Sequence, residues 1–231
     1  MLKRAFFITG TDTGVGKTVA TACLIKTLQN QGFVVGVAKP FESGGNQDGV
    51  WLKQLTGQPD AWDAWAFPYK FKAPMAPGMA AKKAGIKPSL KRVVAGLGNL
   101  QKKVDVLLVE GAGGLMVPLS ADQMVIDLMQ ALGYPAIIVS RLKLGTINHS
   151  LLTVQALRQR KVPVAGWIFN RLGPERLTEV ERMNPSAIEK LSGVPVLGLL
   201  PYTQGLLNFP PFVRILSRNA QASLYARLTQ A

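Results

Sequence analysis

The sequence is poor in the residue types on which several kinds of site depend. Its 231 residues include one cysteine, Cys23, and one histidine, His149. A single cysteine excludes an internal disulfide framework and a metal cage made only of cysteines. A single histidine excludes zinc chemistry that needs paired histidines within one chain. No apolar run approaches the roughly 18 residues of a membrane span, so we expect a soluble intracellular protein.

Acidic residues are also scarce, with 13 against 27 lysines and arginines and a net charge of +14. No acid lies between Asp63 and Asp105, a stretch with nine bases: Lys70, Lys72, Lys82, Lys83, Lys87, Lys91, Arg92, Lys102 and Lys103. A net charge of this sign attracts polyanions and small anionic ligands alike. A solvated basic face would have the same composition, and the stretch has no RNA-binding signature. The charge therefore assigns no partner by itself.

What the sequence does contain is the alternation of an α/β fold. Short, almost continuously apolar segments are expected to be buried strands: residues 5–9, 34–38, 106–109, 136–139, 164–168 and 196–199. Longer segments between them are expected to be helices: residues 17–31, 90–103, 122–132, 149–159 and 185–191. Continuous apolar strands belong to parallel sheets that helices cover on both faces. The pattern predicts a doubly wound, mostly parallel sheet in a single domain over residues 1–231.

One segment interrupts this alternation. From Asp60 to Pro88 the chain is rich in proline, alanine, lysine and aromatic residues. We interpret it as a long loop with a short helix at residues 79–83. Loops of this length within a compact domain are usually functional or disordered. We therefore expect an active-site loop around residues 60–88.

The most specific motif lies between the first expected strand and the first expected helix. It reads Gly10-Thr11-Asp12-Thr13-Gly14-Val15-Gly16-Lys17-Thr18. Its glycines let consecutive backbone N–H groups form an anion site at the positive end of a helix. In a P-loop, the lysine reaches the nucleotide phosphates and the following hydroxyl joins the Mg²⁺ shell. The turn predicts a P-loop NTPase fold, although Thr11 stands where the usual pattern has its first glycine.

Charged residues also follow the ends of neighbouring strands. Glu110 ends a buried strand, at the place where P-loop folds carry a carboxylate that organises Mg²⁺. Lys39 ends the second strand, and a second ammonium group there suits the transfer of a phosphoryl group. Asp48 is a further candidate metal ligand. The alternatives are a loop-capping acid for Glu110, a surface lysine for Lys39 and a helix N-cap for Asp48.

Two further positions are candidates for ligand binding. Residues 143–149, Lys-Leu-Gly-Thr-Ile-Asn-His, lie between a strand and a helix, where backbone amides make an anion site. His149 in this segment is expected to be structural. Asn170 follows the strand at residues 164–168 and is placed to bind a base edge, although a turn asparagine would give the same pattern.

Taken together and in order, these motifs resemble the dethiobiotin synthetase family of biotin biosynthesis. The shared elements are the P-loop with its shifted glycine, Lys39-Pro40 with Ser43-Gly44, Asp48, the run Glu110-Gly-Ala-Gly-Gly, Lys143–His149 and the strand that ends at Asn170. The resemblance extends from about Lys3 to Pro201. It implies a cytoplasmic, homodimeric cyclo-ligase that depends on ATP and Mg²⁺. Its substrates would be 7,8-diaminononanoate and CO₂ or bicarbonate, with no membrane or nucleic-acid partner.

The resemblance also implies roles for individual residues. Lys17 and Lys39 would be catalytic and stabilise the carbamate and the γ-phosphoryl group, while Thr18, Asp48 and Glu110 would hold Mg²⁺. The implied ATP-binding residues are Thr13, Gly14, Val15, Gly16, Lys17, Thr18, Glu110, Gly111 and, at the adenine, Asn170. The implied substrate-binding residues are Thr13, Ser43, Gly113, Gly145, Thr146 and Asn148. The turn at residues 145–148 would hold the substrate's tail carboxylate with help from the partner subunit.

Two other classes of protein use similar P-loops. A partition-type ATPase that associates with DNA would fit the positive charge, but it usually carries a second lysine in the P-loop, where this chain has Asp12. An amidotransferase-type cobyrinate synthetase normally adds a glutaminase domain with a catalytic cysteine, for which 231 residues leave no room. We therefore favour the cyclo-ligase.

Overall fold

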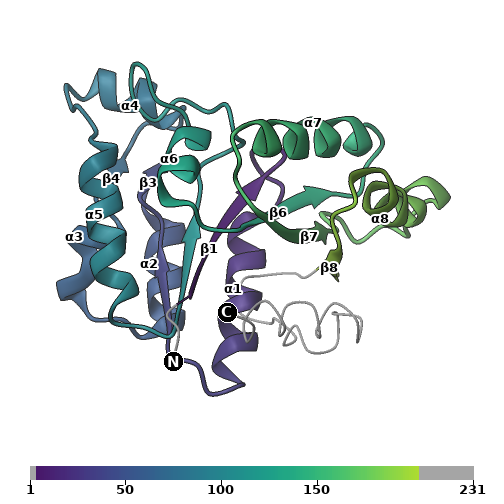
Figure 1. Cartoon of the computed structure of the whole chain (residues 1–231), viewed down its shortest axis with the longest axis horizontal. Coiled ribbons are helices and arrows are strands. Elements are labelled where there is room, and N and C mark those ends of the chain that lie inside the picture. The colour runs from purple at the N-terminus through teal and green to yellow at the C-terminus, as the bar shows by residue number, and fades with distance from the viewer. Residues whose placement is uncertain (1–3, 203–231) are drawn as a thin grey trace.

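The computed structural model describes residues 4–202 and centres on a six-stranded sheet (Figure 1). The strand order is β2-β5-β1-β6-β7-β8, and every pairing in this sheet is parallel. The strands are β1 (Arg4–Gly10), β2 (Val35–Ala38), β5 (Val106–Glu110), β6 (Ala136–Arg141), β7 (Val164–Asn170) and β8 (Val196–Leu200). All six expected strands are present, so the predicted doubly wound parallel sheet is confirmed. The single-domain prediction for residues 1–231 extends beyond the described residues at both ends and stays a prediction.

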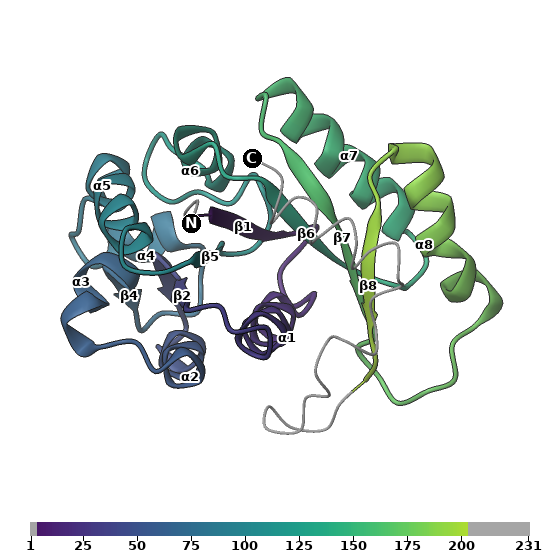
Figure 2. The same ribbon diagram turned by 60° about the horizontal axis from the view of Figure 1, so that its bottom comes forward.

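Helices cover both faces of this sheet. Figure 2 shows α1 on one face and α6 and α7 on the other. The longer helices are α1 (Lys17–Gln29), α2 (Gln47–Thr56), α5 (Leu90–Gln101), α6 (Val125–Leu132), α7 (Thr146–Gln159) and α8 (Glu179–Ser192). The strands are buried on both sides, as their continuous apolar sequences require, except in the edge strand β8, where Leu199 is exposed. Within the described residues, no helix combines the length and apolar character needed to cross a membrane.

Three helices begin at residues other than the expected ones. Helix α6 begins at Val125 rather than Asp122, because the Asp127 carboxylate accepts the Met124 backbone N–H at 2.7 Å and fixes the start there. Helix α7 begins at Thr146 rather than His149, after Gly145 turns the chain with φ 90°. The predicted start of α8 at Pro185 is wrong, since a reciprocal cap between Thr178 and Glu181 starts the helix earlier.

The segment expected to be a long loop is mostly regular structure. It contains a 3₁₀ turn (Asp60–Trp62), α3 (Asp63–Ala66), β4 (Tyr69–Phe71) and α4 (Pro77–Lys83). Strand β4 pairs in parallel with β3 (Phe41–Ser43), and the rings of Phe41 and Tyr69 stack with centroids 5.0 Å apart. The loop prediction is therefore wrong for residues 60–66 and 69–71, because elements of three or four residues are too short to show periodicity. The short helix was predicted correctly but begins two residues earlier.

The register of the sheet brings the motifs to one edge. Strand β1 lies between β5 and β6, and Ile8 is paired with Glu110. Ala38, the last residue of β2, is paired with Val109. Since the strands are parallel, the chain leaves β1, β2 and β5 on the same side, where doubly wound folds bind their ligands.

Candidate functional site

The P-loop turns tightly between β1 and α1. Gly16 precedes the helix with φ 92°, a conformation that glycine adopts without strain. A Cβ atom at Gly16 would lie 1.9 Å from Nδ2 of Asn170, so no larger residue fits there. The Asn170 amide also donates a hydrogen bond to the Val15 carbonyl at 3.1 Å. Asn170 thus supports the P-loop from β7, a contact that the sequence did not suggest.

Lys17 lies along the P-loop from the first turn of α1. Its ammonium group donates to the Asp12 carbonyl at 3.0 Å, and the residue is only 8% exposed. The pKa of Lys17 is lowered to about 8. Burial is the main cause and the charge of Lys39 also lowers the pKa, while Glu110 opposes the change. The ammonium group of Lys17, held beside the P-loop, is electrostatically suited to bind a phosphate.

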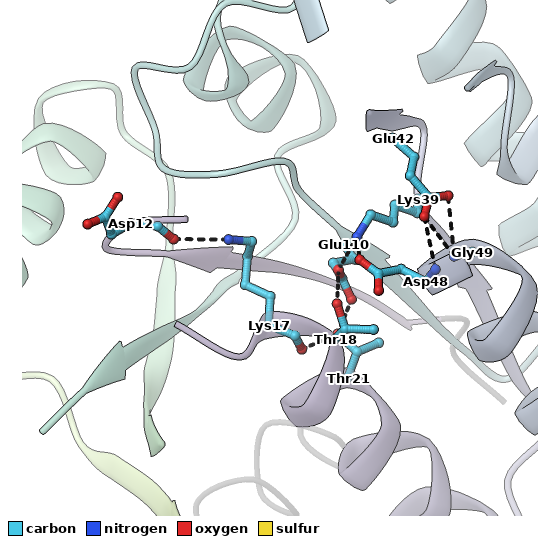
Figure 3. A network of polar contacts seen from close by, with 9 residues as sticks. All are labelled: Asp12, Lys17, Thr18, Thr21, Lys39, Glu42, Asp48, Gly49 and Glu110. Carbon is cyan, nitrogen blue, oxygen red and sulfur yellow. Dashed lines mark hydrogen bonds and ion pairs between the residues drawn. The ribbon is translucent and has the colours of Figure 1, made fainter. Parts of the chain in front are cut away.

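Glu110 is the centre of a buried polar network (Figure 3). Its carboxylate accepts hydrogen bonds from the hydroxyls of Thr18 and Thr21, each at 2.9 Å. The Lys39 ammonium lies 2.7 Å from the same carboxylate and 2.6 Å from that of Asp48. Burial lowers the pKa of Lys39, but the two carboxylates outweigh this effect and leave it above its ordinary value. Lys39 is therefore a charged group held at the junction of two acids.

These residues line one cavity of about 660 Å³. Most of the predicted site residues contribute to its wall: Thr13, Gly14, Gly16, Lys17, Thr18, Lys39, Ser43, Asp48, Glu110, Gly111 and Gly113. The sequence therefore located correctly the residues that meet at the carboxyl edge of the sheet. Val15 is fully buried and does not line this cavity.

The predicted residues at the start of α7, Gly145, Thr146 and Asn148, lie outside this cavity. The Thr146 side chain is buried and its hydroxyl bonds with Ser140 and the Arg141 carbonyl, each at 2.7 Å. Gly145 and Asn148 are exposed. His149 lines a second cavity of about 730 Å³, between α7, the P-loop and residues 114–117. The roles of Gly145, Thr146 and Asn148 in substrate binding stay predictions.

Sequence reasoning missed two residues of the network. Thr21 stands one helical turn after Thr18, and that spacing on α1 was the available signal. Glu42 is 5% exposed in β3, and its carboxylate accepts backbone N–H groups at the start of α2. Burial raises the pKa of Glu42, against the opposing effects of Lys39 and these N–H donors.

The oxygen atoms around Lys39 are suitable ligands for a small divalent cation. The Thr18 hydroxyl and the carboxylates of Asp48 and Glu110 are hard oxygen ligands, which Mg²⁺ prefers together with waters and nucleotide phosphates. Within residues 4–202 no three His, Cys, Asp or Glu side chains cluster, so the protein offers two carboxylates rather than a complete cage. This is the ligand set of a metal that arrives with a nucleotide.

Fold and site together define a P-loop ATPase with two cavity lysines. A family model described as an AAA domain matches residues 4–208. The septum site-determining protein MinD of Pyrococcus horikoshii, solved with Mg-ADP, has the same fold: its TM-score is 0.61 at 20% identity, covering 99% of this chain and 97% of that one.

Relatives with closer sequences define the family further. A protein of Thermodesulfovibrio yellowstonii is 40% identical over 216 residues, which cover 87% of this chain and 90% of the relative. One of Bacillus subtilis is 42% identical over 203 residues, 86% of this chain and 87% of the relative. Both are named ATP-dependent dethiobiotin synthetase BioD. The chain belongs to the dethiobiotin synthetase family, which confirms the resemblance found in its sequence.

Proposed function

We propose that this protein is an ATP-dependent cyclo-ligase that forms dethiobiotin from 7,8-diaminononanoate and CO₂. The observation that carries the proposal is that Lys17, Lys39 and Glu110 line one cavity in a chain 40% identical to a dethiobiotin synthetase. In the proposed reaction one amine adds to CO₂ and loses a proton, which gives a carbamate. The carbamate oxygen takes the γ-phosphoryl group of ATP and ADP leaves. The second amine then attacks the carbamoyl carbon, phosphate departs and the ureido ring closes.

The residues of the cavity supply charge and position for these steps. A carbamate is a poor electrophile until it is phosphorylated, so orientation and charge neutralisation must provide most of the acceleration. Lys17, on the P-loop, would neutralise the γ-phosphoryl oxygens. Lys39, 2.7 Å from Glu110, would neutralise the carbamate from the opposite side. Thr13 and Ser43 lie on the same wall and are proposed to bind phosphate or substrate.

The metal and the adenine have proposed ligands as well. Thr18, Asp48 and Glu110 are proposed to hold Mg²⁺, which would neutralise negative charge on the phosphates. Asn170 is proposed to bind the adenine through the amide atoms that its bond to the Val15 carbonyl does not use. The oxygen donors around Lys39 support the metal assignment.

We also propose that the protein is a cytoplasmic homodimer, in which residues 145–148 hold the tail carboxylate of the substrate with help from the partner subunit. Two large apolar side chains that line the second cavity are exposed, Met116 at 61% and Leu152 at 56%, and Leu144, just before α7, is 88% exposed. Exposed apolar side chains gathered beside one helix are typical of surfaces that bind another protein. They support an association through the α7 face.

The test is direct formation of the ring. Purified protein is incubated with diaminononanoate, bicarbonate, Mg²⁺ and ATP, and the cyclic urea is measured by mass spectrometry together with released phosphate. We expect one phosphate per ring. Lys17→Ala should lower kcat/KM by at least about 10²-fold, since it removes a charge that meets the transition state. Lys26→Ala, which removes an exposed lysine of the same helix, is the matched control. Ring formation at the normal rate by Lys17→Ala would contradict the mechanism.

A further inference from the structure

Glu42 is a buried acid that the proposed reaction does not use. It is the middle residue of β3 and lines the wall of the 660 Å³ cavity. Its carboxylate points at the first turn of α2 (Figure 3). Oε1 accepts the Asp48 backbone N–H at 3.0 Å, and both oxygens lie 3.3 Å from the Gly49 backbone nitrogen.

Helix α2 depends on this outside group for its start. The first backbone N–H groups of a helix have no partner within the helix and are usually satisfied by the N-cap side chain. Asn46, the N-cap residue of α2, makes no such side-chain bond. Glu42 takes its place from a neighbouring strand, and its negative charge also suits the positive end of the helix.

Gly49 allows the carboxylate to come this close. A Cβ atom at position 49 would lie 2.8 Å from Oε2 of Glu42 and 3.1 Å from the Phe67 ring. The backbone there is buried, with little room for either neighbour to move. A glycine in the first turn weakens a helix by about 0.5–1 kcal/mol relative to alanine, so its presence here has a packing reason.

The same turn carries Asp48. Its backbone N–H is bound by Glu42, while its side chain points the other way, 2.6 Å from the Lys39 ammonium. The Asp48 side chain is about half exposed and lies at the end of a helix. Without an anchor for its backbone, the carboxylate would lose orientation relative to Lys39 and Glu110.

From these contacts we propose that Glu42 is a positioning residue, which fixes the first turn of α2 and so holds the Asp48 carboxylate in place for a divalent cation. The proposal rests on the proposed metal role of Asp48. Residues that orient metal ligands typically change metal affinity by 10- to 100-fold when they are replaced. Glu42→Ala should therefore weaken metal binding about tenfold. Glu42→Gln, which keeps one acceptor oxygen, should weaken it less.

Two readouts test the proposal without relying on catalysis. The first is amide hydrogen exchange in the metal-free protein, where the backbone N–H groups of Asp48 and Gly49 should exchange faster in Glu42→Ala. The second is Mn²⁺ binding in the presence of ADP, followed by electron paramagnetic resonance. Asp48→Asn is measured beside the Glu42 variants, and Gln47→Ala, an exposed residue of the same turn, is the control. Gly49→Ala should reproduce the effect of Glu42→Ala while the carboxylate is still present.

The outcomes separate the proposal from the proposed function. Weaker Mn²⁺ binding in Glu42→Ala, Gly49→Ala and Asp48→Asn, with Gln47→Ala unchanged, supports it. Raising the metal concentration should then restore most of the activity of the Glu42 variants. Unchanged Mn²⁺ affinity in Glu42→Ala and Glu42→Gln, with a loss in Asp48→Asn, would overturn the role of Glu42 alone. Unchanged affinity in Asp48→Asn as well would overturn the metal assignment of Asp48 and the proposal with it. Glu42→Gln supplies the answer if Glu42→Ala does not fold.

Discussion

Cys23 lies on the buried side of α1, where a charged side chain is strongly disfavoured. Its side chain is 1% exposed, and burial raises the pKa of its thiol from 9.0 to about 12. Only the thiolate reacts with alkylating agents. We therefore expect no labelling of the folded protein at pH 8 and one label per chain in denaturant, measured by mass spectrometry. The shift also lowers the free energy of unfolding as pH rises above 9, because the unfolded thiol then loses its proton first.

The control for Cys23 uses the same helix. In a Cys23→Ser background, Lys26→Cys puts a thiol on the exposed side of α1, where it should react at the rate of a free thiol. Labelling of native Cys23 as fast as this reporter would contradict the packing of α1 on the sheet.

At the level of single residues, the sequence identified those that follow strand ends. Lys39 and Glu110 could be predicted because each stands at the end of an apolar run, and a parallel sheet brings such ends together. Glu42 could not be predicted in this way. Its strand has three residues, and its partners are backbone N–H groups of α2, which no side-chain pattern in the sequence indicates. Likewise, the contact between Asn170 and Gly16 joins residues that are far apart in the chain.

At the level of helices and strands, the prediction failed for elements of only a few residues and for helices whose N-cap was placed at the wrong residue. The strands of the six-stranded sheet and most of the longer helices were found because they contain enough residues to show a period. Helix α2 was not among the helices expected from periodicity. The 3₁₀ turn, α3 and β4 were missed because they contain three or four residues each. The start of α8 was misplaced because proline is common in a first turn, whereas here Pro185 lies inside the helix after a cap at Thr178.

Two glycines should respond in opposite directions to the same substitution. In β7, a Cβ atom at Gly166 would lie 2.5 Å from Cγ of Leu197 and 2.8 Å from the Pro195 carbonyl oxygen. Gly166→Ala should therefore lower the free energy of unfolding by about 1–3 kcal/mol through overpacking against β8. In α5, a Cβ atom at Gly98 meets nothing within 4 Å. Gly98→Ala should raise the free energy of unfolding by about 0.5–1 kcal/mol, because alanine favours the helix.

Urea denaturation of both variants beside the unchanged protein measures these effects. Each glycine serves as the control for the other, since the chemical change is identical. Stabilisation by Gly166→Ala would mean that β7 and β8 are less closely packed than the structure describes.

For the whole molecule, the acid-free basic stretch and helix α7 lie on different sides. The nine bases of the acid-free stretch are all exposed, along β4, α4, α5 and the adjoining turns. Figure 1 shows α4 and α5 on the side of the molecule opposite α8, with α7 above the other end of the sheet. Repulsion between the nine bases of the acid-free stretch in two copies therefore need not oppose an association through α7, since charges separated by more than about 8–10 Å are largely screened at physiological salt.

The proposed dimer gives the prediction at this scale. Sedimentation velocity over a concentration series should give a particle of about twice the 24.9 kDa chain mass. Leu152→Lys should raise the dissociation constant at least about tenfold, because it brings unpaired charge to an apolar face of α7. Val34→Lys is the matched control, since Val34 is 58% exposed, close to the 56% of Leu152, but precedes the amino end of β2. A monomer at all concentrations, or equal effects of both substitutions, would contradict association through α7.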